Sequence, residues 1–142
     1  MHRRRFLQLS VAAALAANIQ ARHAYAAILG AANTVSADVN AITGDGAEVT
    51  LKQSAVQELG DSLRGNLLLP GHEAYDEARL VLNPSIDKHP ALIVQPKGVA
   101  DVRNAVDFAR ESSLLVAVKC GGHSSSGKST CDLSLIHISE PT

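Results

Sequence analysis

The sequence contains few aromatic residues, few cysteines and no excess of charge of either sign. Among its 142 residues, aromatic side chains make up 3%, tryptophan is absent, and Cys120 and Cys131 are the only cysteines. Two isolated cysteines exclude a disulfide scaffold and a four-cysteine zinc site, so we expect two free thiols and no metal. The formal net charge is −1, and without a basic excess we expect no nucleic-acid partner.

The remaining composition is that of a small globular protein. Hydrophobic residues make up 46% of the chain, which is sufficient for a buried core in one domain. The local patterns therefore have to indicate which fold that core belongs to.

Residues 1–26 have the composition of an export signal. Three arginines at positions 3–5 precede a mildly apolar, alanine-rich stretch, and the tripeptide AYA that ends at Ala26 fits a small-x-small cleavage site. The apolar stretch is too short to anchor in a bilayer. The run RRRFLQ at 3–8 resembles the twin-arginine signal, so we expect the twin-arginine export machinery as a partner and a periplasmic or secreted location after cleavage near Ala26. An ordinary signal peptide with a basic start is the alternative.

The segment after this signal predicts a linker followed by short elements. Residues 27–47 are small and contain glycine and asparagine without a firm period, which predicts a linker or flexible lead-in. Apolar residues at 51, 56, 59 and 63 then predict a helix, for which Thr50 and Gln53 form a capping box and Gly65 is the terminator. NLLLPG predicts a short strand closed by a turn, and EAYDEARLVLN at 73–83 predicts a second helical segment.

The pattern that follows predicts a crossover of two buried strands and a helix. ALIVQP at 91–96 and LLVAVKC at 114–120 are short apolar runs typical of buried strands. Between them, residues 97–112 place four apolar residues on one helical face, namely Val99, Val102, Val106 and Ala109. Asp101 lies in the first turn, where a negative charge interacts favourably with the helix dipole. Strand, helix, strand and glycine-rich loop in this order predict the right-handed crossover of an α/β unit.

The loop CGGHSSSGKST at 120–130 has two interpretations. Residues 122–129 spell G-x-x-x-x-G-K-S, the phosphate-binding pattern of P-loop nucleotide hydrolases. Residues 120–124 spell C-G-G-H-S, which resembles the loop that holds the pyrophosphate of a flavin. Either function needs glycines after a strand, because backbone N–H groups can crowd an anion only where no Cβ intervenes. A P-loop also needs a helix directly after G-K-S, and it usually opens its domain, whereas here a complete crossover comes first.

Five motifs in order resemble one family over residues 50–132. They are R-G-x-x-x-x-P-G from Arg64, Y-D-x-A-R-x-x-x-N from Tyr75, H-P-A-L-I-V-Q-P from His89, D-V-x-x-A-V-x-F-A-R from Asp101 and G-G-H-S from Gly121. With them the chain resembles the FAD-linked oxidases of the vanillyl-alcohol oxidase superfamily, in the berberine bridge enzyme-like group. The resemblance implies an α+β fold, in which residues 48–132 form the amino-terminal part of a truncated FAD-binding domain of the PCMH type, with a βαβ crossover and further strands.

The resemblance also implies FAD as the cofactor of an oxidoreductase, a small-molecule substrate, and molecular oxygen as the electron acceptor. Six residues would form the pyrophosphate side of the FAD site, namely Lys119, Cys120, Gly121, Gly122, His123 and Ser124. Gly121 and Gly122 would let backbone amides approach the pyrophosphate, and His123 would carry a covalent 8α-histidyl bond to the flavin. The alternative for His123 is a loop histidine without a covalent bond. Many members of the family have arginine in place of Lys119, so here the positive charge is kept and the planar fork is lost.

The last ten residues, LSLIHISEPT at 133–142, resemble the translation of a transposase-end sequencing adapter, codon by codon. We therefore expect residues 133–142 not to be native, and the catalytic base, the substrate domain and the other half of the FAD site to lie beyond Asp132. On this interpretation the chain by itself is an inactive fragment of the oxidoreductase. The alternative is a natural strand, because LSLIHIS has apolar alternation.

Overall fold

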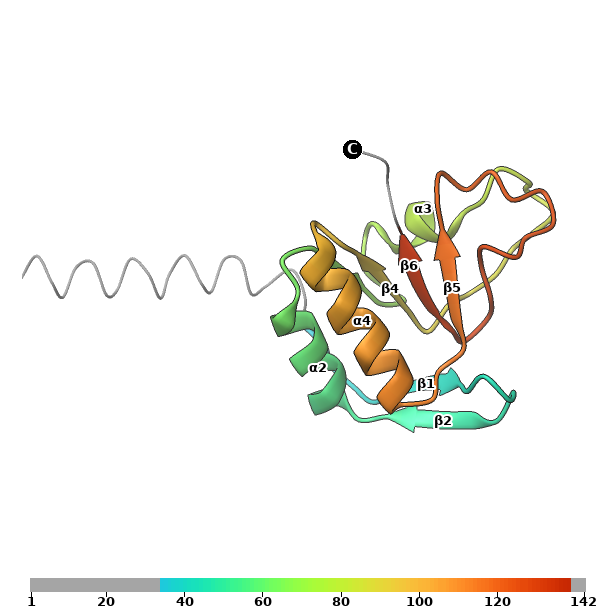
Figure 1. Cartoon of the computed structure of the whole chain (residues 1–142). Helices are drawn as coiled ribbons and strands as arrows, with labels where there is room; N and C mark the ends of the chain where they lie inside the picture. The colour runs from blue at the N-terminus through green and yellow to red at the C-terminus, as the bar shows by residue number, and fades with distance from the viewer. Residues whose placement is uncertain (1–33, 139–142) are drawn as a thin grey trace, which may run out of the picture. The chain divides into compact units, whose positions relative to one another are not determined.

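Short strands and helices alternate along the chain. The computed structural model describes residues 34–138, and the predicted export signal at 1–26 lies outside them. In chain order the elements are β1 (Val39–Ile42), β2 (Glu48–Leu51), α2 (Gln53–Ser62), β3 (Asn66–Leu68), α3 (Tyr75–Arg79), β4 (Leu92–Gln95), α4 (Val99–Glu111), β5 (Val116–Lys119) and β6 (Leu135–Ile138) (Figure 1). No helix within residues 34–138 is long and apolar enough to cross a membrane.

Four strands form the main sheet in the order β3-β4-β6-β5. β3 runs antiparallel to β4, whereas β6 runs parallel to both β4 and β5. Leu135 of β6 pairs with Leu92 on one side and with Val116 on the other. The predicted strand–helix–strand crossover is confirmed, since α4 leads from β4 to the parallel strand β5, and β6 lies between these two strands.

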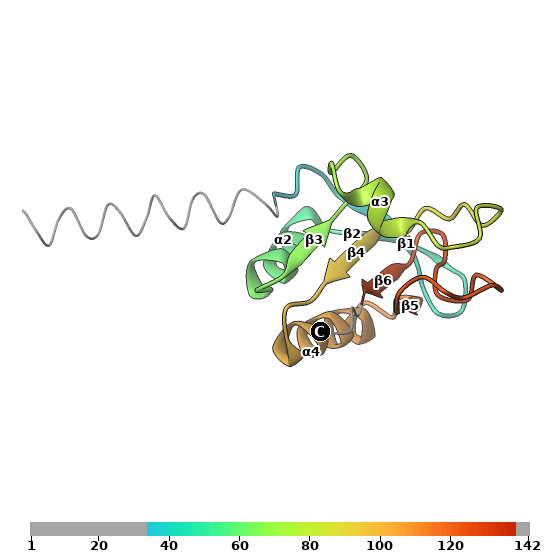
Figure 2. The same cartoon turned by 90° about the horizontal axis from the view of Figure 1, so that it is seen from above.

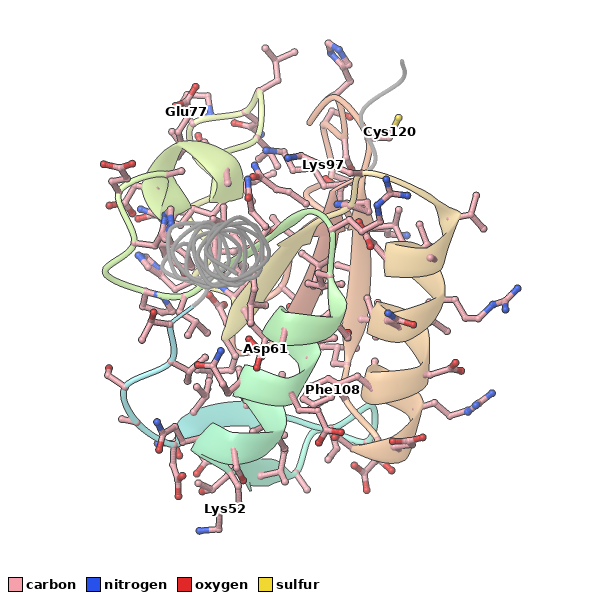
Figure 3. The ribbon with its side chains drawn as sticks, turned by 90° about the vertical axis from the view of Figure 1, so that its left-hand side faces the viewer. Lys52, Asp61, Glu77, Lys97, Phe108 and Cys120 are labelled. Carbon is pink, nitrogen blue, oxygen red and sulfur yellow. The ribbon has the colours of Figure 1, made fainter. Side chains whose placement is uncertain are left out.

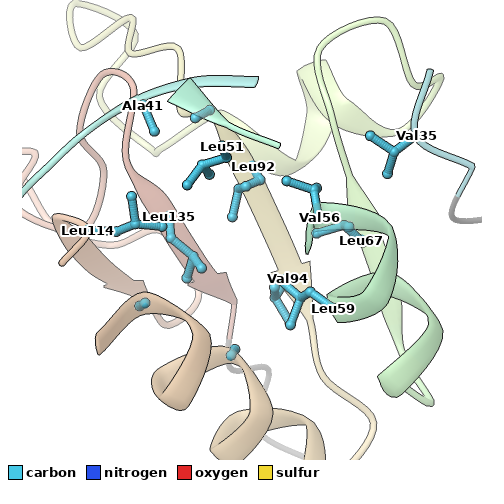
Figure 4. Close-up of a cluster of buried hydrophobic side chains, with 13 residues drawn as sticks. Val35, Ala41, Leu51, Val56, Leu59, Leu67, Leu92, Val94, Leu114 and Leu135 are labelled. Atoms are coloured by element: carbon cyan, nitrogen blue, oxygen red, sulfur yellow. The ribbon is translucent and has the colours of Figure 1, made fainter. Parts of the chain in front are cut away.

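Helices cover both faces of the main sheet. α2 and α4 pack against each other on one face, and α3 packs on the other face against β4 (Figure 2). The larger core cluster fills the space between the sheet, α2, α4 and the first two strands (Figure 4), and consists of Val35, Ala41, Leu51, Val56, Leu59, Leu67, Ala91, Leu92, Val94, Ala105, Ala109, Leu114 and Leu135. The smaller cluster lies under α3 and consists of Leu68, Tyr75, Ala78, Ile93 and Ala117. β4 is buried on both faces, which explains its continuous apolar run.

The predicted linker at 27–47 contains a strand in its described part. β1 and β2 form an antiparallel hairpin, which places the first strand inside this stretch. Only Ala41 of β1 is buried, so the apolar alternation of this strand is too weak to stand out in the sequence. The hairpin is joined to the main sheet by Leu115 N, which donates to Ile42 O (3.0 Å).

The helix predicted after residue 50 is confirmed, but it starts differently. α2 begins at Gln53, and Thr50 pairs within β2 instead of capping the helix. Asp38 takes the capping role, since its Oδ1 accepts the backbone N–H of Gln53 (2.8 Å). The predicted capping box is therefore wrong, because strand pairing claims Thr50 and an acceptor from outside the local sequence replaces it.

Gly65 does not terminate α2 as predicted. The helix ends at Ser62, and Leu63 N then donates to Gly60 O (3.3 Å). Gly65 is buried, and a Cβ at this position would lie 1.9 Å from the carbonyl oxygen of Gln95. The glycine is therefore required by the close approach of two backbones, and not by a left-handed turn.

α4 confirms the predicted helix, but of the four residues in the predicted apolar stripe only Ala109 is buried. Val99 and Val106 are 79% and 51% exposed. The face toward the core carries Asp101, Ala105 and Ala109, each at most 2% exposed. The two alanines let α4 approach the sheet closely, and the carboxylate is accommodated because backbone N–H groups surround it.

β5 is half exposed, whereas the sequence predicts a buried strand. Val116 and Val118 are 39% and 58% exposed, and Ala117 between them is buried in the cluster under α3. Within the described sheet β5 is an edge strand that pairs with β6. An apolar edge strand resembles a buried strand in the sequence because both consist of the same residue types.

Residues 135–138, which the adapter interpretation excludes from the native chain, form β6 in the structure. They pair with strands on both sides, as the apolar alternation of LSLIHIS allows. Apolar residues of either origin can pair in this way. The strand therefore does not test the origin of residues 133–142, which stays a prediction.

Candidate cofactor-binding loop

The glycine-rich loop begins where β5 ends. Residues 120–130 follow Lys119 without forming a helix or a strand. Cys120, the first residue of the loop, lies toward the same end of the sheet as Lys97, which follows β4, and away from Lys52 at the other end (Figure 3). The carboxyl ends of parallel strands therefore meet at this edge, which is where open α/β sheets bind ligands.

Three glycines give the loop a backbone that other residues rarely adopt. Gly121, Gly122 and Gly127 have φ angles of 60°, 68° and 70°. A Cβ on Gly121 would lie 2.9 Å from Cδ2 of His123, and a Cβ on Gly127 would lie 2.7 Å from Cδ1 of Ile86. The backbone conformation and the close contacts both require glycine, so the loop offers a backbone surface that an anion can approach.

Residues 80–87, named the strap from here on, run alongside the loop. Leu82 N donates to Gly122 O (2.9 Å), and Asn83 Nδ2 donates to Ser125 O (3.4 Å). The motif that ends at Asn83 and the G-G-H-S loop are far apart in sequence, yet they form one structural unit.

α3 is shorter than the helical segment predicted at 73–83. The helix ends at Arg79, and the next residue is extended. A continued helix would bond Leu82 N to Ala78 O, whereas Leu82 N donates to Gly122 O instead. The helix therefore ends at a contact with the loop, and the local sequence does not predict this end.

Lys119 reaches α3 with its side chain. Its Nζ donates to Ala78 O (2.6 Å), and its Cε lies 3.2 Å from the position that a Cβ on Gly122 would take. The ammonium group thus binds a carbonyl that α3 leaves open at its end. The structure places Lys119 at the start of the predicted site, with its stem against Gly122 and its ammonium group on the α3 backbone.

The other predicted site residues follow one another in the loop. The thiol of Cys120 is free and exposed, and His123 is exposed with its ring against Gly121. Ser124 is half-buried, and its Oγ lies 3.5 Å from Oγ of Ser126. A thiol and an imidazole are therefore accessible at the start of the loop. No three side chains of His, Cys, Asp or Glu gather as metal ligands in residues 34–138.

Two hydroxyl groups are buried at the far end of the loop, and their residues are not among the predicted site residues. Oγ of Ser129 and Oγ1 of Thr130 are shielded from solvent and have no hydrogen-bond partner in the described chain. Such a group costs about 1–3 kcal/mol, and its presence in a native fold calls for a reason such as a bound ligand. The sequence signal is the density of hydroxyls, since five of the residues at 124–130 are serine or threonine.

The loop is fixed at its far end by Asp132. The two carboxylate oxygens accept hydrogen bonds from Lys88 Nζ (2.7 Å) and His89 N (2.8 Å). Burial opposes the ionisation of this carboxyl group, but the hydrogen bonds outweigh it and hold the pKa of Asp132 below its usual value. The loop is thereby closed onto the residues that follow the strap.

The P-loop interpretation of residues 122–129 finds no support. A helix must follow G-K-S to direct its amino terminus at the phosphates. The described chain instead passes through turns into β6. The described loop therefore lacks the helix that a P-loop needs.

Comparison with curated proteins matches FAD-linked oxidoreductases. The chain is 39% identical over 82 residues to an FAD-linked oxidoreductase of Dictyostelium discoideum, which is 57% of this chain and 18% of that protein. It is 34% identical over 61 residues to the uncharacterized FAD-linked oxidoreductase YvdP of Bacillus subtilis (strain 168), which is 43% of this chain and 14% of that protein. The chain thus spans less than a fifth of the length of these curated relatives. No protein-family model matches it.

Solved structures with the same fold are oxidases and berberine bridge enzyme-like proteins. 6-Hydroxy-D-nicotine oxidase of Arthrobacter nicotinovorans matches with a TM-score of 0.53 at 24% identity, over 55% of this chain and 17% of that chain, and this likeness shows the fold. BBE-like 1 of Physcomitrella patens matches with a TM-score of 0.51 at 27% identity, over 61% of this chain and 18% of that chain. The expected partial FAD-binding fold of the PCMH type is confirmed. Over the matched stretch the chain is similar in sequence to FAD-linked oxidoreductases and has the fold of berberine bridge enzyme-like proteins.

Proposed function

We propose that the protein represented by this chain is an FAD-dependent oxidase, and that residues 119–130 form the pyrophosphate side of its FAD site. The observation that carries the proposal is a loop with three glycines at positive φ, at the carboxyl end of a parallel strand. The identity to FAD-linked oxidoreductases supports it. The buried hydroxyls of Ser129 and Thr130 also support it, because a bound anion can provide the partner that they lack.

The loop fits the cofactor through its backbone. The N–H groups around Gly121 and Gly122 would approach the pyrophosphate, because no Cβ covers the backbone there. The hydroxyl of Ser124 is half-buried beside them and would donate a further hydrogen bond. Bound FAD supplies the acceptor for a hydride from the substrate. The residues of this chain bind and orient it.

We also propose that His123 holds the flavin through a covalent bond to its 8α carbon. This bond replaces one C–H bond of the 8α methyl group and the imidazole N–H bond, the two hydrogen equivalents reduce the flavin, and molecular oxygen reoxidises it to give hydrogen peroxide. The imidazole is exposed and lies against the Gly121 backbone, so it is accessible to a flavin that binds at the loop. The experiment is acid denaturation of the full-length protein purified with its cofactor. We expect the yellow colour to remain on the precipitated polypeptide, and His123→Ala to release all flavin into the supernatant.

His89→Ala is the matched control, because His89 is an exposed histidine outside the loop. In this variant the flavin should stay on the polypeptide. If the wild-type precipitate is colourless and the supernatant yellow, the covalent bond is disproved and bound FAD is retained as the function. If neither fraction contains flavin, the proposed function itself fails.

For the substrate side we propose a small molecule that donates a hydride, with molecular oxygen as the electron acceptor. The oxygen reaction can be tested before the substrate is known. The flavin is reduced with light under nitrogen, with EDTA as the electron donor, and is then mixed with air-saturated buffer. We expect fast reoxidation with one hydrogen peroxide formed per flavin, and reoxidation no faster than that of free reduced flavin would indicate a different acceptor.

A further inference from the structure

α3 and the glycine loop exchange hydrogen-bond partners. In a helix that continued past Arg79, Leu82 N would donate to Ala78 O. In the structure, Leu82 N donates to Gly122 O (2.9 Å), and Ala78 O accepts from Nζ of Lys119 (2.6 Å). The donor and the acceptor of the missing helical hydrogen bond, Leu82 N and Ala78 O, are thus each hydrogen-bonded to a residue in or next to the loop.

We infer that Lys119 is a positioning residue for the loop, and that its ammonium group holds Gly122 in place by preventing α3 from continuing through Leu82. The role toward the cofactor rests on the proposed function of the loop. The role toward the backbone rests on the contacts of this chain alone.

The ammonium group of Lys119 is a strong partner for the open carbonyl. The last carbonyls of a helix have no intrahelical donor, and a lysine side chain that reaches them satisfies the helix end. A hydrogen bond from a charged donor is roughly twice as strong as one from a neutral amide. The Lys119 side chain is half-buried, which limits competition from water for Ala78 O.

Arg79 ties the other end of the strap to the same turn of α3. Its guanidinium group donates to the carboxylates of Asp76 and Asp87, and its side chain is only 13% exposed. Within the strap, Ile86 lies against Gly127 of the loop. A rearrangement at the end of α3 would therefore displace the loop both at Gly122 and at Gly127.

Loss of the Lys119 ammonium leaves a defined alternative structure. Ala78 O can then accept Leu82 N, and α3 gains residues through Leu80 and Val81. Pro84 limits this gain, because the residue before a proline disfavours the helical region. Gly122 O loses its donor in this alternative, and the loop is no longer held against the strap.

The experiment compares wild type, Lys119→Met, Lys119→Arg and Lys52→Met in the whole 142-residue chain. Lys52 is an exposed lysine at the other end of the sheet (Figure 3), so its replacement removes an equal charge away from α3 and from the loop. NMR scalar coupling across hydrogen bonds identifies the acceptor of Leu82 N–H directly. We expect coupling to the Gly122 carbonyl carbon in wild type, Lys119→Arg and Lys52→Met.

In Lys119→Met we expect that coupling to be lost and the Cα shifts of Leu80 and Val81 to become helical. Coupling of Leu82 to Gly122 that persists in Lys119→Met would overturn the inference. If the methionine variant does not fold, as judged by the amide signals of β4, Lys119→Gln is measured by the same criterion.

Titration with FAD tests the role toward the cofactor, and it uses the same four variants of the full-length protein prepared without cofactor, because this chain is expected to hold only part of the FAD site. Binding is followed by flavin fluorescence. We expect Lys119→Met to bind FAD about tenfold more weakly than the other three, which corresponds to one hydrogen bond to a charged group. Equal affinity of Lys119→Met and wild type would overturn that role. If none of the four binds FAD, the proposed function of the loop fails, whereas the coupling of Leu82 still decides whether Lys119 positions the backbone.

Discussion

The buried carboxylate of Asp101 accepts the backbone N–H of Gly65 at 3.0 Å, although 36 positions separate the two residues in the sequence. The same carboxylate accepts Arg64 N (2.9 Å) and Lys97 N (2.7 Å). One side chain in the first turn of α4 therefore joins the residues before β3 to the residues after β4. Three donors replace the water that the charge loses on burial, which is why a carboxylate can lie on the core face of this helix.

We expect Asp101→Asn to lower the free energy of unfolding by about 1–3 kcal/mol. The amide offers one acceptor oxygen in place of two, so at least one buried N–H group is left without a partner at about 1–3 kcal/mol. Asp107→Asn is the matched control on α4, because the Asp107–Arg110 pair lies on the surface and contributes less than about 1 kcal/mol. Urea unfolding followed by circular dichroism measures both variants, and equal midpoints for the two would contradict the role of Asp101.

Asp101 also determines part of the dependence of stability on pH. Burial opposes ionisation of its carboxyl group, but the N–H groups of Arg64, Lys97 and Gly65 outweigh it and lower the pKa of Asp101 below the model-compound value of 3.8. A carboxyl whose pKa is lower in the folded than in the unfolded chain stabilises the fold above the unfolded pKa, and this contribution disappears as pH falls through the folded pKa.

The free energy of unfolding of the wild type should therefore fall as pH is lowered below about 4, and less steeply in Asp101→Asn. Other carboxyl groups with lowered pKa values, such as that of Asp132, stay in the variant and keep part of the slope. Urea midpoints measured from pH 2 to pH 7 give both curves. Parallel curves would show that Asp101 does not titrate with folding.

We expect Gly65→Ala to destabilise the fold by more than about 2 kcal/mol, because its Cβ would overlap a backbone oxygen that cannot move without breaking the pairing of β3 with β4. Gly44→Ala in the β1–β2 turn is the control. A Cβ on Gly44 would meet nothing within 4 Å, and its φ is not positive. The control should change stability by less than about 1 kcal/mol in either direction. A thermal midpoint of Gly65→Ala equal to that of Gly44→Ala would contradict the close backbone approach.

The elements with dense local patterns could be predicted from the sequence. The apolar run of β4 and the helix at Val99–Glu111 follow from residue type and period. Features that depend on a distant partner could not be predicted in this way. Thr50 loses the capping role to β2 pairing, and Gly65 is needed because β4 lies close to it. The core face of α4 could be predicted only in part, at Ala109, because Asp101 resembles a surface residue until its three backbone partners are known.

For the candidate site, the motif predicted which residues lie together but not how they are held. Cys120, Gly121 and His123 follow one another in any fold, so their proximity is local. The contact of Gly122 with Leu82 and that of Lys119 with Ala78 join segments about forty residues apart. No spacing rule connects such segments. The buried hydroxyls of Ser129 and Thr130 likewise become visible only when the loop has its three-dimensional form.

We expect export of the folded precursor to require the guanidinium groups of Arg3 and Arg4. These residues lie outside the described part of the chain, and the proposal rests on the run RRRFLQ at 3–8. Arg3→Lys with Arg4→Lys keeps the positive charge and removes the planar fork, so an ordinary secretory signal would tolerate the change, whereas a twin-arginine signal would not.

Arg5→Lys is the matched control, because position 5 is the variable place of the motif. Cell fractionation and immunoblotting of a bacterial host should show uncleaved precursor in the cytoplasm for the double variant, and mature protein in the periplasm for wild type and Arg5→Lys. Undiminished periplasmic protein in the double variant, or export in a host without the twin-arginine translocase, would refute the route.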